Sequence, residues 1–514
     1  MLSYITRRLG VLFVILFGSS FILYNLAAIS GDPLEGLRTS TEPNAKQQII
    51  TLTRELQLNV PPPLRYFIWL KGILGVFSGN IDFGKTRDSE QVIDAIALAI
   101  PTTIRLVTAA TIIAIILGIT LGIVTALRQY RRFDYSMTFV SFLMFSLPIF
   151  WVAVLLKQYL AIQFNDFLAN PDISLPWILG ISAFSGVFWS AVISGTRKRV
   201  LQIFAIAALS TALLLEVLSS LKWFANPGLG PVIIFILGIG IAFGVTQLST
   251  GISNRQALNA AISMAVIGTI SYFPAQWAFE TSRPRLALLI MAVITIGFAI
   301  ASANVFARVD KGAVIRTAVI TAVLVALLVI LDQLMSQWAP YMANDAVNYR
   351  PVPTFGQTRD WFSPVPFWTR TLDILIHLIL PTIALTLISF AGYIRFSRGT
   401  LLEVLNQDYI RTARAKGLTE RTVIMRHAFR NTMIPISTIM VVDFAGIIGG
   451  AIITERVFGW TGMGTLFNKA IGSFDLNLLM GVFFLTASLS VLANLVADLL
   501  YSALDPRIRV GAGK

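Results

Sequence analysis

Few side chains of this chain are suited to covalent or metal chemistry. The 514 residues include no cysteine and only two histidines, His377 and His427, which lie far apart in the sequence. A thiolate nucleophile and a Cys-based metal site are therefore excluded. No pair of carboxylates and no cluster of metal ligands stands out, although carboxylates alone can bind a hard cation. We expect no catalytic residue and no metal site, which disfavours a membrane enzyme such as a glycosyltransferase.

One short motif suggests nucleotide chemistry. Residues 79–86 read GNIDFGKT, and Gly79, Gly84, Lys85 and Thr86 satisfy the P-loop pattern. A P-loop also needs a buried strand before it and a helix after it, so that backbone N–H groups surround the phosphates. Here an aromatic, Gly-rich stretch precedes the motif. We therefore expect no nucleotide and no other cofactor on this chain.

The third candidate for a functional residue is an ionisable side chain inside an apolar run. Asp443 lies in such a run, and burying a charge there costs about 2.5–3.5 kcal/mol on insertion scales. The same run contains Ser437 and Thr438, while Gly446 and Gly450 are spaced to let another helix approach closely. One hypothesis is that this run lines a solute pathway, with Asp443 facing water. The alternative, a hydrogen-bonded structural Asp, stays equally open.

The composition shows which elements must position these residues. Hydrophobic residues make up 56% of the chain and charged residues 13%, whereas about 25% charged residues is usual in soluble domains. Runs of roughly 20 apolar residues are long enough to cross a bilayer as helices. The net charge of +14 resides in short loops between apolar runs. It therefore indicates membrane topology and attraction to lipid headgroups rather than nucleic-acid binding.

The apolar runs predict an all-α integral membrane protein with about twelve transmembrane helices. The expected spans are residues 9–29, 102–127, 135–161, 176–194, 201–221, 231–249, 257–279, 286–306, 314–335, 375–396, 435–454 and 478–502. Basic residues at the inner turns place both termini in the cytoplasm of a multi-pass cell-membrane protein. Residues 30–97 and 336–372 then form external segments.

The longest predicted cytoplasmic loop, residues 397–432, has an ordered pattern. Its segment 408–431 reads DYIRTARAKGLTERTVIMRHAFRN. A charged helical piece ends near Gly417, which is a suitable helix C-cap. A second helical piece, residues 419–430, precedes Pro435. The positive-inside rule explains the charge of this loop, but it does not explain the helix–Gly–helix order.

This segment resembles the coupling loop of ABC import permeases, in the form found in the dipeptide and oligopeptide subfamily. The general loop has Ile-x-Leu-Pro where this chain has His427, Ala428, Phe429 and Arg430, with the proline later at Pro435. That departure is typical of the peptide subfamily. Other stretches agree in order: ITRRLG at the start, IPTTIRL, HLILPTIALTL, ITERVFGWTGMGTL and ALDPRIR.

The resemblance implies three parts. Residues 1–165, with the external domain 30–97, and residues 341–514 are similar to a permease core of about six helices. Residues 166–340 have no counterpart and are predicted to be an inserted six-helix module, which is either a lipid-facing bundle or a regulatory or partner-binding block.

The resemblance also implies a role and partners. The chain is expected to be a transport subunit without enzymatic activity, passing short peptides and coupling to separate ATPase subunits. The implied coupling residues are Asp408, Tyr409, Arg411, Thr412, Ala413, Arg414, Ala415, Lys416, Gly417, His427, Arg430 and Asn431. Expected partners are a second homologous permease, two ATPase subunits that bind ATP and Mg²⁺, and an extracytoplasmic substrate-binding protein.

Two alternatives remain. An importer of this kind for nickel or another small solute would share the same motifs. A twelve-span secondary transporter fits the number of spans, but such carriers usually show related halves. We find no internal repeat, and a carrier has no evident use for the 408–431 segment.

Overall fold

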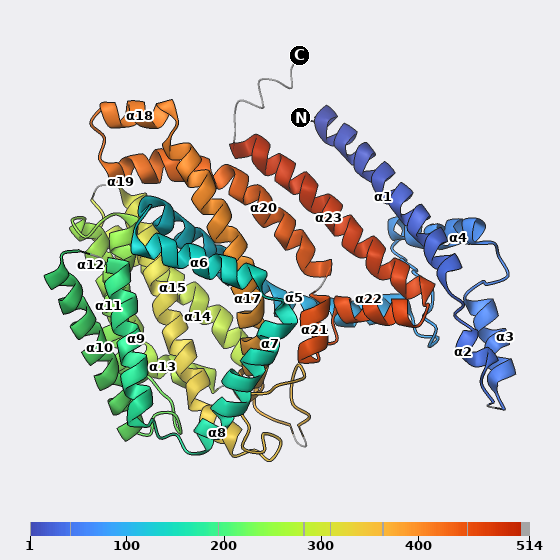
Figure 1. The fold of residues 1–514 in the computed structure, drawn as a ribbon, viewed down its shortest axis with the longest axis horizontal. Coiled ribbons are helices and arrows are strands. Elements are labelled where there is room, and N and C mark those ends of the chain that lie inside the picture. Colours follow the sequence, from blue (N-terminus) through green and yellow to red (C-terminus); the bar gives the residue numbers. More distant parts are fainter. Residues whose placement is uncertain are drawn as a thin grey trace. The chain divides into compact units, whose positions relative to one another are not determined.

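The chain is a bundle of helices in a computed structural model, and its contacts divide it into two compact units. The described residues are 2–41, 43–193, 195–280, 283–308, 310–361, 364–449 and 451–504. Within them the backbone is helical apart from connecting loops and one isolated β-bridge, between Lys85 and Gln91 (Figure 1).

The first unit comprises Met1–Ala161, Thr354–Gln357 and His377–Lys514. Its helices are α1 (Leu2–Ser30), α2 (Glu35–Arg38), α3 (Ala45–Glu55), α4 (Pro62–Leu74), η1 (Gly75–Ser78), α5 (Val92–Leu127), α6 (Arg132–Ser146), α7 (Ile149–Lys157), the π-helix η2 (Gln158–Ile162), most of α17 (Phe367–Leu405), α18 (Asp408–Ala415), α19 (Glu420–Thr422), the π-helix η3 (Val423–Ala428), α20 (Phe429–Gly449), α21 (Ile452–Phe458), α22 (Met463–Gly472) and α23 (Leu476–Leu504).

The second unit comprises Ile162–Pro353 and Thr358–Ile376. Its helices are α8 (Gln163–Ala169), α9 (Leu175–Ile193), α10 (Arg197–Ser220), α11 (Gly230–Ser249), α12 (Arg255–Ile270), α13 (Tyr272–Phe279), α14 (Pro284–Phe306), α15 (Lys311–Ser336), α16 (Trp338–Met342) and the first turns of α17. The three-part division expected from the sequence remains a prediction.

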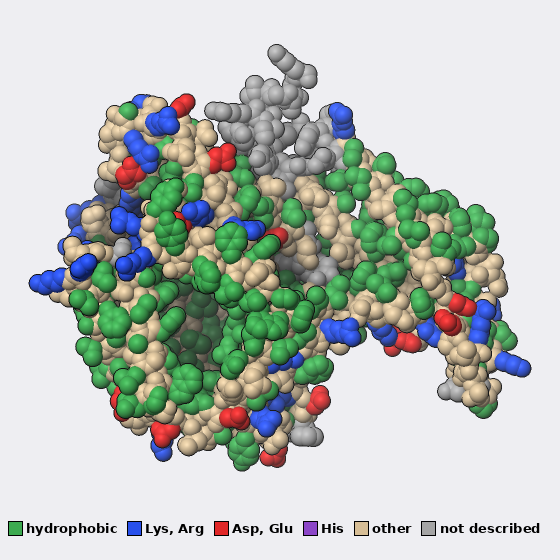
Figure 2. Space-filling model, in the orientation of Figure 1, with side chains coloured by type: hydrophobic (Ala, Val, Ile, Leu, Met, Phe, Trp, Pro, Cys, Tyr) green, Lys and Arg blue, Asp and Glu red, His purple; other side chains and the backbone are tan. Residues whose placement is uncertain are grey.

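The prediction of an all-α integral membrane protein is confirmed. Among the described residues, nine helices are long and apolar enough to cross a membrane, and two bent pairs bring the number to eleven. The other predicted span, residues 435–454, begins on α20 and extends past its end at Gly449, and some of the α20 side chains are outside the described set. Figure 2 shows hydrophobic side chains along the sides of the helices, as a lipid solvent requires, and Lys and Arg side chains around α18.

Both bends occur at prolines. The α6 helix meets the α7–α8 segment at 100°, where Leu147 is extended before Pro148, because the residue before a proline disfavours the helical conformation. The bend of 50° between α12 and α13 lies beside Pro274, which lacks the N–H needed to continue the ladder of hydrogen bonds. Each bend therefore has a local cause in the sequence.

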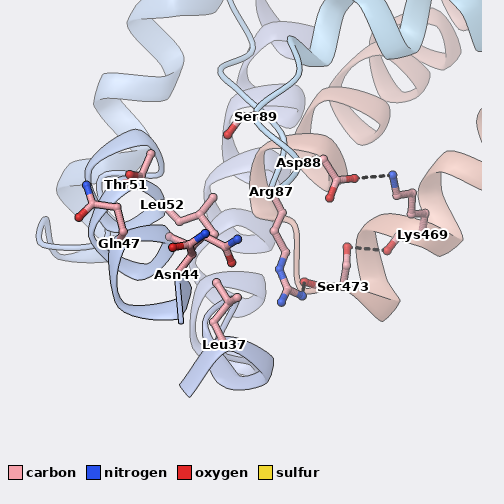
Figure 3. A pocket seen from close by; sticks show the side chains of 11 residues that line it. Leu37, Asn44, Gln47, Thr51, Leu52, Arg87, Asp88, Ser89, Lys469 and Ser473 are labelled. Carbon is pink, nitrogen blue, oxygen red and sulfur yellow. Dashed lines mark hydrogen bonds and ion pairs between the residues drawn. The ribbon is translucent and has the colours of Figure 1, made fainter. Parts of the chain in front are cut away.

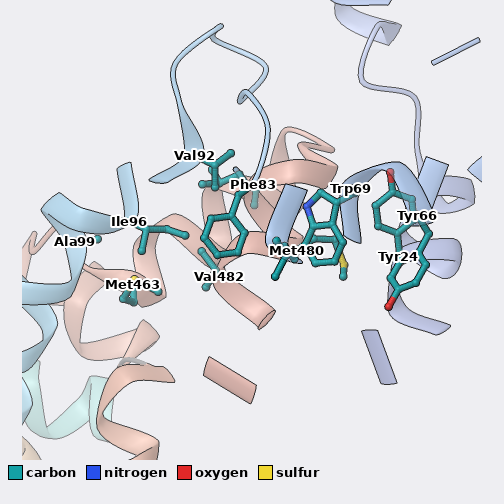
Figure 4. Close-up of a cluster of buried hydrophobic side chains, with 13 residues drawn as sticks. Tyr24, Tyr66, Trp69, Phe83, Val92, Ile96, Ala99, Met463, Met480 and Val482 are labelled. Atoms are coloured by element: carbon teal, nitrogen blue, oxygen red, sulfur yellow. The ribbon is translucent and has the colours of Figure 1, made fainter. Parts of the chain in front are cut away.

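Aromatic packing fixes α4 and the loop after it onto the spans of the first unit. Tyr66 and Trp69 of α4 lie buried with Tyr24 of α1, and the cluster continues to Phe83 and Met480 (Figure 4). The Tyr66 hydroxyl lies 2.8 Å from Ser20 Oγ, so its polar end is paired. Aromatic contacts of this kind add about 0.5–1.5 kcal/mol each beyond burial.

The second unit has a different core, made of small side chains. Its central cluster consists largely of alanines from α12, α14 and α15, with Val314 and Met264. Small residues let helix backbones approach closely, which is how helices associate in lipid. By contrast, α10 buries none of its side chains, so its apolar residues are available to lipid.

A buried carboxylate completes this second core. Asp332 of α15 accepts the backbone N–H groups of Leu229 and Gly230 at 2.6 and 3.0 Å, which lie at the start of α11. The Tyr272 hydroxyl donates to the same carboxylate at 2.6 Å. The negative charge therefore caps the positive end of a helix dipole. Asp332 is therefore engaged by three hydrogen bonds within this unit.

Candidate functional site

The segment predicted to couple to another protein forms a short amphipathic helix, α18. Its Ile410 and Ala413 are buried against Leu401 of α17, Ala126 of α5 and Val423 of η3. Three apolar elements thus fix one face of α18 on its own subunit. The opposite face is left to solvent, because the remaining side chains of this eight-residue helix are polar or small.

The exposed face of α18 carries one acidic and two basic side chains. Arg411 lies 3.6 Å from Asp408, and their side chains are 72% and 98% exposed. Arg414 Nε donates to Glu420 Oε1 at 2.8 Å, which ties α18 to α19. Exposed ion pairs contribute about 0–1 kcal/mol to stability, so these charges remain available to a partner surface.

Gly417 ends this helix in a defined motif. Its N–H donates to the Arg414 carbonyl at 2.9 Å, and the Leu418 N–H donates to the Ala413 carbonyl at 3.4 Å. This pair of bonds is a Schellman motif, which requires the left-handed φ of +74° that Gly417 adopts. The next helical piece begins at once, because the Thr419 hydroxyl accepts the Thr422 N–H. The helix–Gly–helix prediction is confirmed.

The remaining predicted coupling residues extend along the same segment. Asn431 donates to the Tyr409 hydroxyl at 2.8 Å, joining the start of α20 to α18. His427 is half-buried in the π-helix η3 and Arg430 is exposed. Thr412, Ala415 and Lys416 lie exposed on or beside α18. The structure therefore brings these residues into one element, while their role in coupling stays a prediction.

An ion pair that the sequence analysis missed anchors this region. Arg398 of α17 donates two N–H bonds to the carboxylate of Asp134, at 2.9 and 3.1 Å. The Tyr130 N–H donates to the same buried carboxylate at 3.1 Å. A bidentate pair of this kind fixes both distance and orientation. It ties the α5–α6 turn to α17 two turns before α18 begins.

The pathway candidates lie on α20. Asp443 is exposed in the isolated chain, and its carboxylate accepts the hydroxyl of buried Tyr393 at 2.5 Å. Thr438 Oγ1 is buried and has no hydrogen-bond partner in the described part of the chain, whereas Ser437 donates to the Ile434 carbonyl at 2.7 Å. The sequence analysis missed Tyr393, because nothing in the sequence showed which residue of α17 faces Asp443.

The glycine pair of α20 is only partly described. Among the residues that the structure describes, nothing lies within 4 Å of the position that a side chain on Gly446 would take. Gly450 lies outside the described residues. The pathway prediction for these residues remains untested.

A second buried carboxylate was also missed. Glu455 of α21 is fully buried. It accepts the Thr103 hydroxyl at 2.8 Å and the Thr465 N–H at 2.8 Å. A side chain on Gly462 would collide with Glu455 and Thr103. The ITERVFGWTGMGTL stretch thus folds α21 and α22 around a satisfied carboxylate and fixes them to α5.

Within the described residues around it, the P-loop-like segment has neither the preceding strand nor the adjoining helix of a P-loop. Among the described residues 79–92, Thr86 is followed by a turn, and helix α5 begins only at Val92. Lys85 Nζ is paired with Glu55 Oε1 at 2.7 Å, and Ser89 Oγ donates to the other Glu55 oxygen at 2.8 Å. These hydrogen bonds, first that from Lys85, lower the pKa of Glu55. The lysine that would contact phosphate is therefore already engaged.

Comparison with known proteins identifies the family. Residues 118–510 match the family described as "Binding-protein-dependent transport system inner membrane component". This match covers well over half of the chain, including α18 and the pathway candidates.

Curated relatives agree over a shorter segment. The oligopeptide transport system permease protein OppB of Mycobacterium tuberculosis (strain ATCC 25618 / H37Rv) is 43% identical over 143 residues, which are 28% of this chain and 44% of the relative. The oligopeptide permease protein AppB of Bacillus subtilis (strain 168) is 43% identical over 136 residues, 26% of this chain and 43% of the relative. The dipeptide permease protein DppB of Escherichia coli (strain K12) is 44% identical over 138 residues, 27% of this chain and 41% of the relative.

The matched segments span less than half the length of these relatives. The family match is broader, and it agrees with the apolar helices and with the helix–Gly–helix segment. The chain therefore belongs to the family of inner membrane components of binding-protein-dependent transport systems.

Proposed function

We propose that this chain is the permease subunit of an ATP-driven importer of short peptides. The observation that carries the proposal is α18, a helix fixed to its own subunit by Ile410 and Ala413 and exposed on its opposite, charged face. The names of the relatives, which are oligopeptide and dipeptide permeases, support peptides as the substrate class.

In this proposal the chain itself does no covalent chemistry. Two ATPase subunits bind the α18 face, and ATP and Mg²⁺ are held by those subunits. A second homologous permease completes the pathway, and a binding protein delivers peptide to the outer face. Both termini lie in the cytoplasm. ATP binding and hydrolysis then shift the spans between two states by differential contacts with α18.

Reconstitution tests this proposal. The chain is purified from its native membrane in mild detergent, its bound proteins are identified by mass, and the complex is placed in liposomes. We expect ATPase subunits and a second multispan protein to co-purify, and labelled dipeptide to accumulate only with ATP. Uptake by the chain alone without ATP would instead establish a secondary carrier, and ATP-driven uptake of nickel but not of peptide would change the substrate class.

A matched pair of arginine variants tests the α18 surface. Arg414→Ala removes the link between α18 and Glu420 and should reduce peptide uptake per ATP hydrolysed without preventing insertion. Arg316→Ala removes an exposed arginine of α15 and should leave this ratio unchanged. Equal coupling in both variants would contradict the assignment of the α18 surface.

Asp443 tests the pathway. Asp443→Ala should abolish most uptake while the complex still assembles, if this carboxylate faces the moving solute. Tyr393→Phe keeps the carboxylate and removes only its hydrogen bond, so it should retain more uptake than Asp443→Ala. Wild-type uptake in Asp443→Ala would leave Asp443 with a structural role only.

A further inference from the structure

The outer segment of the first unit contains a pocket of about 670 Å³. One wall is formed by α2 and α3, and the other by residues 87–89 and α22 (Figure 3). Sites for small organic ligands usually have volumes of about 300–1,000 Å³. The pocket is thus large enough for a short peptide, and every residue that lines it belongs to the same unit.

Arg87 is the unusual residue of this pocket. Its backbone N–H donates to Asp475 Oδ2 at 2.6 Å, and its Nη1 donates to the Ser473 carbonyl at 3.3 Å. These two bonds hold the half-buried side chain between the walls, where Figure 3 shows it. Among the described residues, no carboxylate lies within ion-pair distance of its guanidinium. Most of the five N–H donors of this planar cation therefore remain available.

The other charged side chains of the pocket compensate each other. Lys469 Nζ lies 2.8 Å from Asp88 Oδ2, and this hydrogen bond raises the pKa of Lys469. Ser89 is engaged by Glu55. The pocket consequently has one cation without an opposite charge, and guanidinium groups bind carboxylates in a bidentate manner.

The opposite wall offers neutral groups. Asn44, Gln47 and Gln48 of the α3 region expose side-chain amides that bond to no other described residue. A primary amide both donates and accepts, so it can pair with the N–H and with the carbonyl of a peptide bond. A ligand with a carboxylate next to two or three peptide bonds could pair its carboxylate with Arg87 on one wall and its peptide bonds with the amides on the other.

We propose that this pocket binds a short peptide by its C-terminal carboxylate, which pairs with Arg87 while the amides of Asn44, Gln47 and Gln48 contact its backbone. The inference rests on the proposed function for the identity of the substrate, and it assigns an outer binding site on the permease itself. A concave pocket of this volume favours a small ligand over the flat surface that protein partners usually share.

Cysteine protection tests the proposal directly, since the chain contains no natural cysteine. Gln47→Cys places one thiol in the pocket, and Lys71→Cys places one on exposed α4 outside it. The full chain is held in phosphatidylcholine nanodiscs at pH 7, and the rate of maleimide labelling is measured with trialanine or with its C-terminal amide. We expect saturating trialanine to slow labelling at residue 47 at least fivefold. The amide should require at least tenfold higher concentration, and residue 71 should be unaffected.

A variant background then identifies the carboxylate partner. Arg87→Gln should abolish the preference for trialanine over its amide, whereas Arg38→Gln, which removes an arginine paired with Asp32, should preserve it. Equal protection by both peptides, or a preference that survives Arg87→Gln, would overturn the proposal.

Two further outcomes separate the possible occupants. If the purified binding protein without peptide protects residue 47 and trialanine does not, the pocket is a docking site for that protein and our assignment is wrong. ATP-driven uptake in liposomes is measured in parallel. Absence of protection with intact uptake would remove this inference alone, whereas protection without any ATP-driven uptake would remove the proposed function.

Discussion

One carboxylate in each unit lies in an apolar helix, and the two differ in exposure and in hydrogen bonding. In the second unit, Asp332 is buried and accepts hydrogen bonds from two backbone N–H groups and from Tyr272. In the first unit, Asp443 is exposed, and Tyr393 is its one hydrogen-bond donor among the described residues. Both carboxylates lie in apolar helices, so the same residue type is structural in one place and available in the other.

The second unit also pairs some of its hydroxyl groups between helices. Ser263 and Ser302 pair at 2.6 Å, and Thr317 donates to Ser249 at 2.9 Å, inside the second unit. The first unit instead exposes the charged face of α18. Polar groups that form hydrogen bonds within a subunit stabilise it. Polar groups that are held in place without such bonds are available to bind a partner or a solute.

The largest expected effect comes from a charge beneath α18. Ile410→Asp would place an unpaired carboxylate among Leu401, Val423 and Ala428, at a cost of about 3–5 kcal/mol. Helix α18 should detach from the helices on which it packs, and the ATPase subunits should no longer co-purify with the membrane-inserted chain. Ile410→Val, which costs only about 0.5–1.5 kcal/mol, should keep them bound. Retention in Ile410→Asp would show that the exposed face of α18 is not the binding surface.

A somewhat smaller effect is expected in the second unit. Asp332→Ala removes the acceptor for the start of α11 and for Tyr272, which should cost about 1–3 kcal/mol of stability. The apparent midpoint of thermal unfolding, followed by tryptophan fluorescence in detergent, should fall, while uptake per folded complex stays unchanged. Glu216→Ala, at an exposed carboxylate, serves as the control and should shift the midpoint little. Loss of uptake without loss of stability would give the second unit a part in transport.

Gly417 provides a more local test. A residue with a side chain at this position must adopt the left-handed backbone conformation at φ +74°, which costs about 1–2 kcal/mol. Gly417→Ala should therefore lower peptide uptake per ATP hydrolysed roughly fivefold. Gly399→Ala lies in helix α17, where nothing is within 4 Å of the added carbon, and should be neutral. Equal coupling in the two variants would mean that the end of α18 need not be fixed.

The smallest effect concerns pH at α3. Because Lys85 and Ser89 lower the pKa of Glu55 below its ordinary value of 4.5, their stabilising contact is complete at neutral pH. It is lost as the pH falls through the lowered value. Hydrogen exchange of α3 should become roughly twofold faster in acid than intrinsic rates explain, as expected for an exposed pair. The Glu55→Gln variant should show no such change, and the same acceleration in that variant would exclude Glu55 as the cause.

Much of the fold was predictable because bilayer thickness fixes the length of an apolar run. The position of Gly417 at the end of a helix followed from the residue types on either side of it. The start of α5 was harder to predict. The helix begins at Val92 rather than near residue 102, because Val92 and Ile96 in its first turns pack in the same hydrophobic cluster as α4.

The partners of the buried charges could not be predicted. Asp134 and Arg398, or Glu455 and Thr103, are hundreds of positions apart in the sequence. Their contact depends on how each helix is rotated about its axis. In a membrane protein this rotation leaves little trace in a single sequence, because lipid-facing and buried side chains are both apolar.

The capped end of α18 has a consequence for how quickly partners assemble. Its Schellman bonds, the Thr419 cap and the seat of Ile410 order the helix before any other subunit arrives. Association then loses little chain entropy, unlike the coupled folding of a disordered segment. The rate of complex formation should accordingly behave as rigid-body docking, limited by orientation and by the charges on the exposed face, and it should fall as ionic strength rises.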